Sequence, residues 1–196
     1  NRAYEGDYTR LMESGLYERL VKAGYLIPHV EANRVAPAND ASPKGDAAFK
    51  IIQPERVPFI SYPYEWSFGQ LKSAALATLT IQKRALKADM TLKDASAYNM
   101  QFVRGKAMLI DTLSFEIYQE GQPWVAYKQF CQHFLAPLAL MALKDVRLSQ
   151  LLRVYIDGVP LDLASELLPT KTRFNFGLLT HIHVHAGAQK NMLVKK

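Results

Sequence analysis

Three polar residues in one short stretch have the types and the spacing that phosphoryl transfer requires. The stretch is TLKDASAYNMQFVRGKAMLIDTLSFE, residues 91–116, and it contains Asp94, then Asn99 five positions later and Asp111 after twelve more. Transfer of a phosphoryl group from ATP needs a base that orients the acceptor hydroxyl, and it needs oxygen ligands for magnesium. Two carboxylates and one amide are the smallest set of side chains that supplies both. The stretch therefore contains the minimum set for metal-assisted phosphoryl transfer.

The same three residues also have structural interpretations. An aspartate such as Asp94 can cap a turn, and Asn99 can hold a left-handed backbone position. Asp111 ends the β-like run AMLID, and the sequence shows no obvious turn for it to serve before Ser114. The spacing favours a metal site and leaves the structural roles open.

Helices are predicted on both sides of this stretch. In residues 8–24 the apolar residues recur at helical spacing, which predicts one amphipathic helix. Residues 67–87 are rich in Ala and Leu and contain no proline, which predicts one long helix or two short ones, with Ser67 as the N-cap. After Pro123 the chain is helical in character throughout.

Strands are predicted from apolar runs that are rich in β-forming residues. LIPHV is typical of a short strand, and AFKII and VPFISY, joined by QPER, suit an antiparallel pair. The composition of residues 33–47, rich in Pro, Asn, Asp, Ala and Gly, predicts a mobile loop. In the central stretch, YNMQFV and AMLID are separated by a gap centred on Gly105, which predicts a hairpin.

Composition excludes several classes of protein. The chain has 196 residues, 49% of them apolar, which suffices for one sizeable core. Its net charge of +6 permits an anionic partner, but the basic residues are spread out and nothing resembles a nucleic-acid reader. The single cysteine, Cys131, excludes an internal disulfide. Because there is no apolar run of membrane-spanning length and no signal-peptide pattern, we expect a cytoplasmic protein without a membrane partner.

The order of the elements around the polar triple resembles the kinase-like fold. A strand and hinge at VPFISYPYEW, helices, Asp94, a hairpin and Asp111 follow one another as in small-molecule kinases of the aminoglycoside phosphotransferase type. The resemblance implies an α+β, protein-kinase-like fold. Its reduced N-terminal lobe would occupy residues 1–62, and its mainly helical C-terminal lobe would occupy residues 63–196.

The same resemblance implies roles for individual residues. Asp94 takes the position of the catalytic base, and Asn99 and Asp111 take the positions of the Mg²⁺ ligands. The backbone of the hinge would face the adenine of ATP. The residues implied in cofactor binding are therefore Tyr62, Pro63, Tyr64, Glu65 and Trp66. Packing under the large lobe also explains the aromatic residues of the hinge.

The chain departs from the kinase pattern around the nucleotide site. Leu92 stands where these kinases usually have His, and Thr112 and Leu113 follow Asp111 in place of Phe-Gly. No GxGxxG occurs to cover the phosphates. These departures put in doubt that phosphoryl transfer is active, because kinase-like loops persist in inactive relatives.

The lysine that binds ATP in kinases has no clear equivalent here. Lys50 in AFKII resembles it, but only seven residues separate Lys50 from Pro58, which leaves no room for the helix that carries the Glu partner. We therefore expect the helix over residues 8–24 to be the small-lobe helix, with Glu13 or Glu18 as the ion-pair acid. The lysine-bearing strand would then lie upstream of Asn1, and either truncation has removed it or the nucleotide site is incomplete.

Two longer segments resemble a bacterial family of class I S-adenosylmethionine-dependent methyltransferases related to nodulation proteins. They are FISYPYEWSFGQLKSAALATLTIQKRALKADMTLKDASAYNMQF and LIDTLSFEIYQEGQPWVAYKQFCQHFLAPLALMAL. In that family the methyltransferase domain lies C-terminal to the region resembled here, and this chain has no strand with a GxGxG-like turn for S-adenosylmethionine. The resemblance implies an accessory domain whose partner is a C-terminal methyltransferase domain. Both ends read as cut points, so we expect a fragment of a longer protein.

Histidines and the cysteine give weaker signals. On a strand, the three histidines of THIHVH would share one face, whereas on a helix only His181 and His185 are neighbours. The flanking residues favour a helix, so we expect ordinary packing or a surface row in place of a metal site. Cys131 and His133 lie in the most apolar predicted helix, where we expect a buried thiol and a core histidine.

Three functional hypotheses follow from these observations. The first is a kinase-like accessory domain of an S-adenosylmethionine-dependent methyltransferase that binds a magnesium nucleotide or another small anionic ligand. The second is an active small-molecule phosphotransferase that uses ATP. The third is a non-catalytic platform, as in pseudokinases, whose loop is vestigial.

Overall fold

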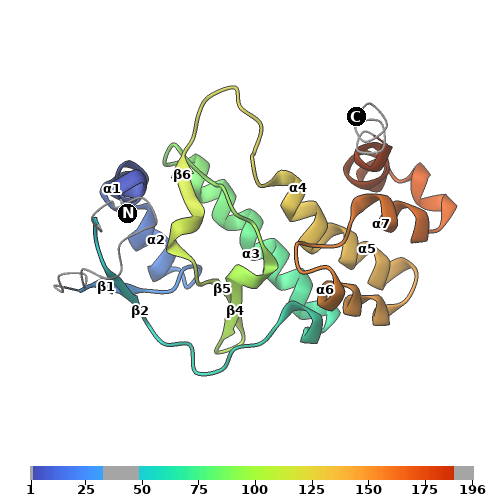
Figure 1. Ribbon diagram of the computed structural model, residues 1–196, viewed down its shortest axis with the longest axis horizontal. Coiled ribbons are helices and arrows are strands. Elements are labelled where there is room, and N and C mark those ends of the chain that lie inside the picture. Colours follow the sequence, from blue (N-terminus) through green and yellow to red (C-terminus); the bar gives the residue numbers. More distant parts are fainter. Residues whose placement is uncertain (1, 33–48, 188–196) are drawn as a thin grey trace. The chain divides into compact units, whose positions relative to one another are not determined.

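The computed structural model describes residues 2–32 and 49–187, and it combines helices with short antiparallel strands (Figure 1). The chain divides into two compact units. The first contains residues 1–60, 77–94 and 99–124, and the second contains residues 61–76, 95–98 and 125–196. Most of the central stretch groups with the N-terminal helices, whereas residues 95–98 group with the C-terminal helices. The division expected at residue 62 stays a prediction. The mixture of helix and strand agrees with the α+β expectation, and the kinase-like identity of the fold stays a prediction.

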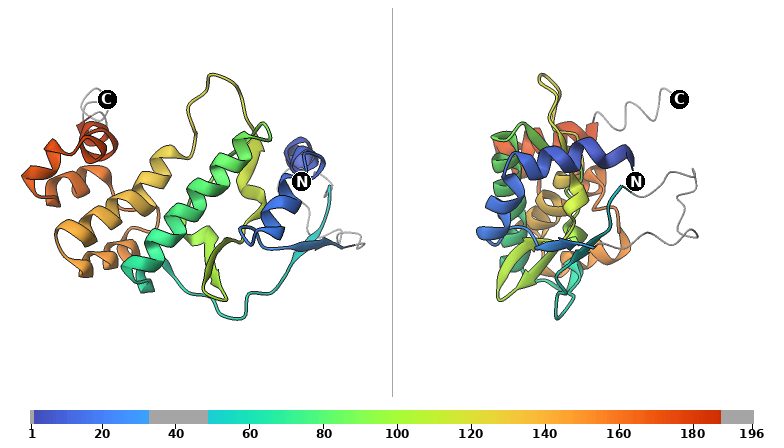
Figure 2. Two further views of the ribbon diagram at one scale, coloured as in Figure 1. Left: turned by 180° about the vertical axis from the view of Figure 1, so that it is seen from behind. Right: turned by 90° about the vertical axis from the view of Figure 1, so that its left-hand side faces the viewer.

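The predicted helix over residues 8–24 is two helices, α1 (Glu5–Glu13) and α2 (Leu16–Lys22), which run in different directions (Figure 2). The chain turns at Gly15, whose φ of 67° lies in the left-handed region that glycine adopts without a Cβ clash. The predicted apolar face is present. Its completely buried members are Leu11, Leu16 and Leu20.

The N-terminal strands pair differently from the prediction. β1 (His29–Glu31) pairs antiparallel with β2 (Ile52–Pro54), which begins at the last residue of AFKII. The predicted pairing of AFKII with VPFISY is therefore wrong, and VPFISY forms no strand. Its proline, Pro58, has no N–H to donate to a ladder. The predicted mobile loop, residues 33–47, lies outside the described residues.

The predicted hairpin is confirmed. β4 (Met100–Val103) and β5 (Lys106–Leu109) pair antiparallel (Figure 1). The two turn residues, Arg104 and Gly105, have φ of 51° and 77°. Positive φ at both central positions is typical of a type I′ turn, whose twist matches that of the flanking strands.

A second ladder, which the sequence did not predict, joins the two ends of the central stretch. β3 (Met90–Leu92) pairs antiparallel with β6 (Phe115–Ile117). Gln82 anchors β3 from the neighbouring helix. Its Oε1 accepts a hydrogen bond from Leu92 N at 2.8 Å, and its Nε2 donates to Thr91 Oγ1 at 2.9 Å. These bonds satisfy the buried side-chain amide of Gln82, and they fix the end of β3 that precedes the loop containing Asp94.

The helix that carries Gln82 is α3 (Phe68–Leu86), as predicted for residues 67–87. Ser67 is its N-cap, because Ser67 Oγ accepts a hydrogen bond from Gln70 N at 3.2 Å. Gln70 Oε1 in turn accepts from Ser67 N at 2.9 Å. This reciprocal pair is a capping box, which satisfies two amides that the helix itself leaves without a partner.

The second unit is helical, as predicted for the chain after Pro123. Its α-helices are α4 (Tyr127–Phe130), α5 (Ala136–Leu143), α6 (Leu151–Val154), α7 (Leu161–Leu167) and α8 (Phe176–Leu178). Two π-helical segments lie among them, Cys131–Leu135 and Leu179–Val184. Its completely buried side chains include Phe134, Leu140, Leu152 and Leu161. In residues 2–32 and 49–187, no helix is both long enough and apolar enough to cross a membrane.

Candidate functional site

The two ladders of the first unit bring the ends of the central stretch together. Because β3 and β6 are antiparallel, the loop that leaves β3 starts where β6 begins, and Lys93 N donates to Ser114 O at 2.8 Å. The hairpin holds the other end of this loop, because Ile110 N donates to Asn99 O at 2.8 Å. The predicted catalytic loop is thus tied by its backbone to the residues on either side of Asp111.

Asn99 and Asp111 meet at one hydroxyl group. Asn99 Nδ2 donates to Ser114 Oγ at 3.4 Å, and Ser114 Oγ donates to Asp111 Oδ2 at 2.8 Å. All three side chains come from the first unit. Asp94 is half-buried and lies two residues beyond β3, at the end of the ladder where Ser114 precedes β6. The structure therefore brings the two predicted Mg²⁺ ligands together and places the predicted base at the same end of the ladder.

Asp111 also has a structural role that the sequence did not reveal. It is the N-cap of a 3₁₀ turn, Thr112–Ser114, and its Oδ1 accepts a hydrogen bond from Leu113 N at 2.9 Å. The expectation that Asp111 serves no turn before Ser114 is therefore wrong. An ionised carboxylate has about four acceptor positions, so two hydrogen bonds do not prevent it from binding a metal.

The predicted adenine-facing residues form a compact 3₁₀ turn in the second unit, Pro63–Glu65. Tyr62 N donates to Glu65 Oε2 at 2.7 Å, and Glu65 N donates back to Tyr62 O at 2.8 Å. Tyr64 O accepts from Gln150 Nε2 at 2.9 Å, and the ring of Trp66 is buried. Much of the backbone that was expected to face adenine is thus engaged within the protein. The adenine-binding role of this turn stays a prediction.

A polar network in the first unit was missed by the sequence reasoning. The Tyr8 hydroxyl lies 2.9 Å from His29 Nε2 and donates to Glu31 Oε1 at 3.1 Å. Lys50 Nζ donates to both carboxylate oxygens of Glu31, at 2.6 and 2.7 Å. The network continues from His29 Nδ1 to Thr112 Oγ1 at 3.4 Å. It therefore connects the N-terminal strands to the residue that follows Asp111.

The network shifts the pKa values of its members. The hydrogen bond from Lys50 holds the pKa of Glu31 below its usual value, with the Tyr8 hydroxyl adding to the effect. Burial lowers the pKa of His29, and burial together with Glu31 raises the pKa of Tyr8. These shifts favour the ionised form of Glu31 and the neutral forms of His29 and Tyr8.

Lys50 is paired with Glu31 and not with either predicted acid. Glu13 and Glu18 are exposed, and neither forms an ion pair with a residue that the structure describes. Among the described residues, no lysine pairs with either glutamate to form the ion pair expected from kinases. The prediction that one of them pairs with a lysine preceding this sequence stays untested.

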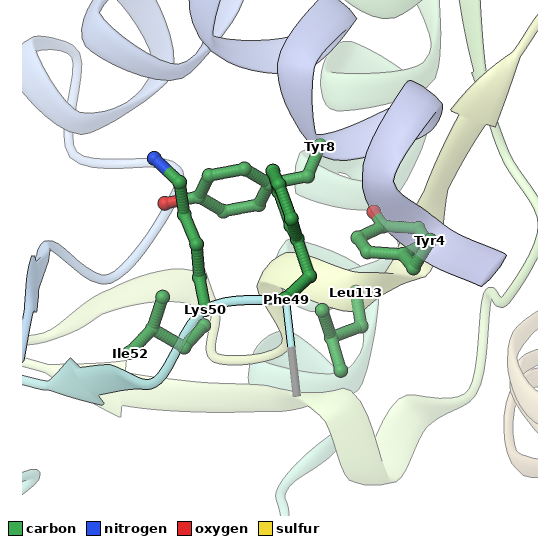
Figure 3. A pocket seen from close by; sticks show the side chains of 6 residues that line it. All are labelled: Tyr4, Tyr8, Phe49, Lys50, Ile52 and Leu113. Carbon is green, nitrogen blue, oxygen red and sulfur yellow. The ribbon is translucent and has the colours of Figure 1, made fainter. Parts of the chain in front are cut away.

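Beside the network is a pocket of about 280 Å³ (Figure 3). It is lined by Tyr4, Tyr8, Phe49, Lys50, Ile52 and Leu113. Tyr4 and Tyr8 come from the start of the chain, one helical turn apart, which is the one signal that could have pointed to this site in the sequence. The remaining lining residues come from two other segments, and only the tertiary structure brings them there.

The histidine row lies in the second unit and is held by ordinary hydrogen bonds. His183 Nδ1 lies 2.7 Å from Ser165 Oγ, and His183 Nε2 lies 2.9 Å from Thr172 Oγ1. His181 Nδ1 pairs with the Tyr127 hydroxyl. Across the described residues, no group of three or more His, Cys, Asp or Glu side chains is placed to hold a metal ion.

Cys131 and His133 lie inside the second unit, as expected. Both are buried, and burial raises the pKa of the Cys131 thiol. The ring of His133 meets that of Tyr98 edge-on, with centroids 6.2 Å apart. A thiol with a raised pKa carries little thiolate at neutral pH, so it is a poor nucleophile.

Comparison with known proteins gives one informative match. The chain is similar to Nodulation protein NoeA. The chain is 37% identical to the protein from Rhizobium meliloti (strain 1021) over 167 residues, and this match covers 83% of the chain. The chain spans 35% of the length of that relative. No family model matches the chain, and no solved structure matches it.

Proposed function

We propose that this chain forms a kinase-like accessory region of a longer S-adenosylmethionine-dependent methyltransferase, and that its central loop binds a magnesium nucleotide. The observation that carries the proposal is the meeting of Asn99 and Asp111 at the hydroxyl of Ser114. Methyl transfer would take place in a C-terminal domain outside this chain.

The extent of the similarity to NoeA supports the accessory role. That relative is nearly three times as long as the part the chain matches, since the chain spans 35% of it. A protein of that length has room for a separate methyltransferase domain. The sequence of this chain offers no glycine-rich turn for S-adenosylmethionine, so the proposal places that cofactor elsewhere.

The chemistry of the loop supports magnesium as the ion. Mg²⁺ prefers carboxylate and amide oxygens, and it is commonly held by one or two protein groups together with phosphate oxygens of the substrate. Asp111 and Asn99 supply such groups from two neighbouring backbone segments. Asp94, half-buried at the same end of the ladder, is the group that would orient an acceptor hydroxyl if phosphoryl transfer occurs.

A second candidate is a non-catalytic platform, and one observation favours it. Both carboxylate oxygens of Asp111 already accept hydrogen bonds within the turn that Asp111 caps. This arrangement gives the residue a reason to be present without any metal. The two candidates differ in whether the charge of Asp111 is needed for ligand binding.

The deciding experiment is calorimetric titration of ATP and of ADP, each with and without Mg²⁺, into the wild-type chain and into Asp111→Asn. Asparagine keeps an oxygen to accept from Leu113 N, so the turn is retained while the charge is removed. We expect Mg²⁺-dependent binding that weakens at least about tenfold in the variant. The matched control is Asp145→Asn, because Asp145 Oδ1 caps another 3₁₀ turn by accepting from Arg147 N, also at 2.9 Å.

The absence of binding at millimolar nucleotide would reject the nucleotide site and leave the platform. Binding that Mg²⁺ does not affect, and that Asp111→Asn does not change, would place an anionic ligand away from this loop. Asp94→Asn then separates binding from catalysis, since loss of a base abolishes phosphoryl transfer without abolishing nucleotide binding.

A further inference from the structure

The pocket beside the polar network has walls that are mainly aromatic and aliphatic. Three rings, those of Tyr4, Tyr8 and Phe49, line it together with Ile52 and Leu113 (Figure 3). The rings of Tyr8 and Phe49 meet edge to face, with an interplanar angle of 76° and centroids 6.3 Å apart. A space of about 280 Å³ with such walls accommodates a flat molecule of one or two rings.

Among the residues that line the pocket, Lys50 is the cation. Lys50 Nζ lies 5.4 Å from the centroid of the Tyr8 ring and 5.7 Å from that of the Phe49 ring, within the range of a cation–π contact. An ammonium group has three N–H donors, and Lys50 directs its two described hydrogen bonds at the single carboxylate of Glu31. The Lys50 side chain is 37% exposed, so an acceptor on a ligand can reach it.

The charges around the pocket restrict the ligand. Lys50 is paired with Glu31, and Lys93, whose Nζ lies 4.3 Å from the centroid of the Tyr4 ring, lies 4.0 Å from Asp7 Oδ2. Burial lowers the pKa of His29, which favours its neutral form. A nucleoside triphosphate would bring several negative charges to a site without net positive charge. A molecule with a single negative charge can instead share the ammonium of Lys50 with Glu31 and bury its ring against the walls.

We propose that this pocket binds a small aromatic carboxylate, with the ring against Tyr8 and Phe49 and the carboxylate hydrogen-bonded to Lys50 Nζ. This site is separate from the proposed nucleotide site and does not depend on it. It shares one turn with that site, because Leu113 lines the pocket and its N–H donates to Asp111 Oδ1.

The test uses two probes with the same ring system, 2-naphthoate and the uncharged 2-naphthalenemethanol. Binding is followed by the methyl resonances of Ile52 and Leu113 in a methyl-labelled sample. We expect both methyl groups to shift with 2-naphthoate, with a dissociation constant of about 0.1–1 mM, as is usual for ligands of this size. The uncharged probe should bind more weakly.

Two variants assign the contacts. Lys50→Met keeps the apolar stem and removes the cation, so it should weaken 2-naphthoate about tenfold and leave 2-naphthalenemethanol unchanged. The control is Lys106→Met, an exposed lysine in β5 that does not line the pocket. Ile52→Trp fills the space and should abolish binding of both probes, and an unchanged unfolding midpoint shows that this variant is folded.

Three results would overturn the proposal. The first is no shift of either methyl group at about 5 mM probe. The second is an equal loss of affinity for 2-naphthoate in Lys50→Met and Lys106→Met. That result would show that Lys50 acts only through the overall charge of the protein and not through a contact with the probe. The third is undiminished binding in a folded Ile52→Trp variant, which would place the probe elsewhere.

Discussion

The Tyr4 hydroxyl shares its one proton between the backbone carbonyl of Phe115, at 2.8 Å, and that of Thr112, at 3.2 Å. One side chain from the first turn of the chain therefore holds both ends of the turn that Asp111 caps. Burial, together with the nearby carboxylate of Asp7, raises the pKa of Tyr4, so the hydroxyl stays protonated and remains a donor. The geometry of the candidate metal loop depends on a residue more than a hundred positions away.

Tyr4→Phe removes this hydroxyl and keeps the ring. We expect the free energy of unfolding to fall by about 0.5–1.5 kcal/mol, because two carbonyls lose a shared donor. Urea denaturation measures the change. Tyr118→Phe is the control, since none of the described residues hydrogen-bonds to the Tyr118 hydroxyl. Equal effects of the two substitutions would show that the Tyr4 hydroxyl does not stabilise the turn.

Gln82→Leu should destabilise the first unit more strongly. The change leaves the buried Leu92 N–H and the Thr91 hydroxyl without their partner, which costs about 1–3 kcal/mol. The unfolding midpoint in urea reports the loss. Lys83→Leu, at the exposed neighbouring position of the same helix, should change it by less than about 0.5 kcal/mol. A loss in Gln82→Leu as small as in the control would contradict the anchoring role.

Gly105→Ala tests the hairpin turn. A Cβ at this position meets no atom within 4 Å, so the cost comes from the positive φ alone and amounts to about 1–2 kcal/mol. Gly6→Ala in α1 is the matched control, because its added Cβ also meets nothing within 4 Å and its backbone is helical. That substitution should stabilise the chain by about 0.5–1 kcal/mol. Thermal unfolding of both variants gives changes of opposite sign if the turn is type I′.

The stability of the chain should fall in mild acid because of His183. Burial and the charge of Arg173 lower the pKa of His183 below its ordinary value near 6.5. The unfolded chain then binds a proton at a higher pH than the folded chain, so stability is complete above about pH 6.5 and decreases as the pH falls toward the folded pKa. The measurement is the urea midpoint at about pH 7.5 and pH 5.5.

His183→Gln should make that midpoint less sensitive to pH. His29, whose pKa is also lowered by burial, contributes in the same direction. A midpoint that changes with pH in the same way in the wild type and in His183→Gln would contradict the assignment.

The sequence by itself determined those elements whose cause is local. The N-cap at Ser67, the apolar spacing of α3 and the Arg104-Gly105 turn each depend on residues a few positions apart, so the sequence alone can show their patterns. The spacing of Asp94, Asn99 and Asp111 is of the same kind. It predicts that the three residues meet, and the structure brings two of them, Asn99 and Asp111, to the hydroxyl of Ser114. The metal site itself stays a prediction.

The tertiary structure decided which segments pair. β1 ends at Glu31 and β2 begins at Ile52, and β3 ends at Leu92 while β6 begins at Phe115. The two strands of each ladder are therefore far apart in the sequence, and no local pattern specifies their pairing. The VPFISY run had the composition of a strand, but composition does not say which partner is within reach. The single helix predicted for residues 8–24 failed for a related reason, since an apolar stripe continues across a glycine that turns the chain.

The pairing of the ladders also decided what the chemical groups do. Antiparallel β3 and β6 place Ser114 between Asn99 and Asp111, and the same turn makes Asp111 a cap. Lys50 forms its ion pair with Glu31 of β1 and not with an acid on a helix, because the pairing of β1 with β2 brings Glu31 beside it. Residue types and spacing fix which chemistry is available, but side chains interact only over a few ångströms, and those distances are set by contacts between segments far apart in the sequence.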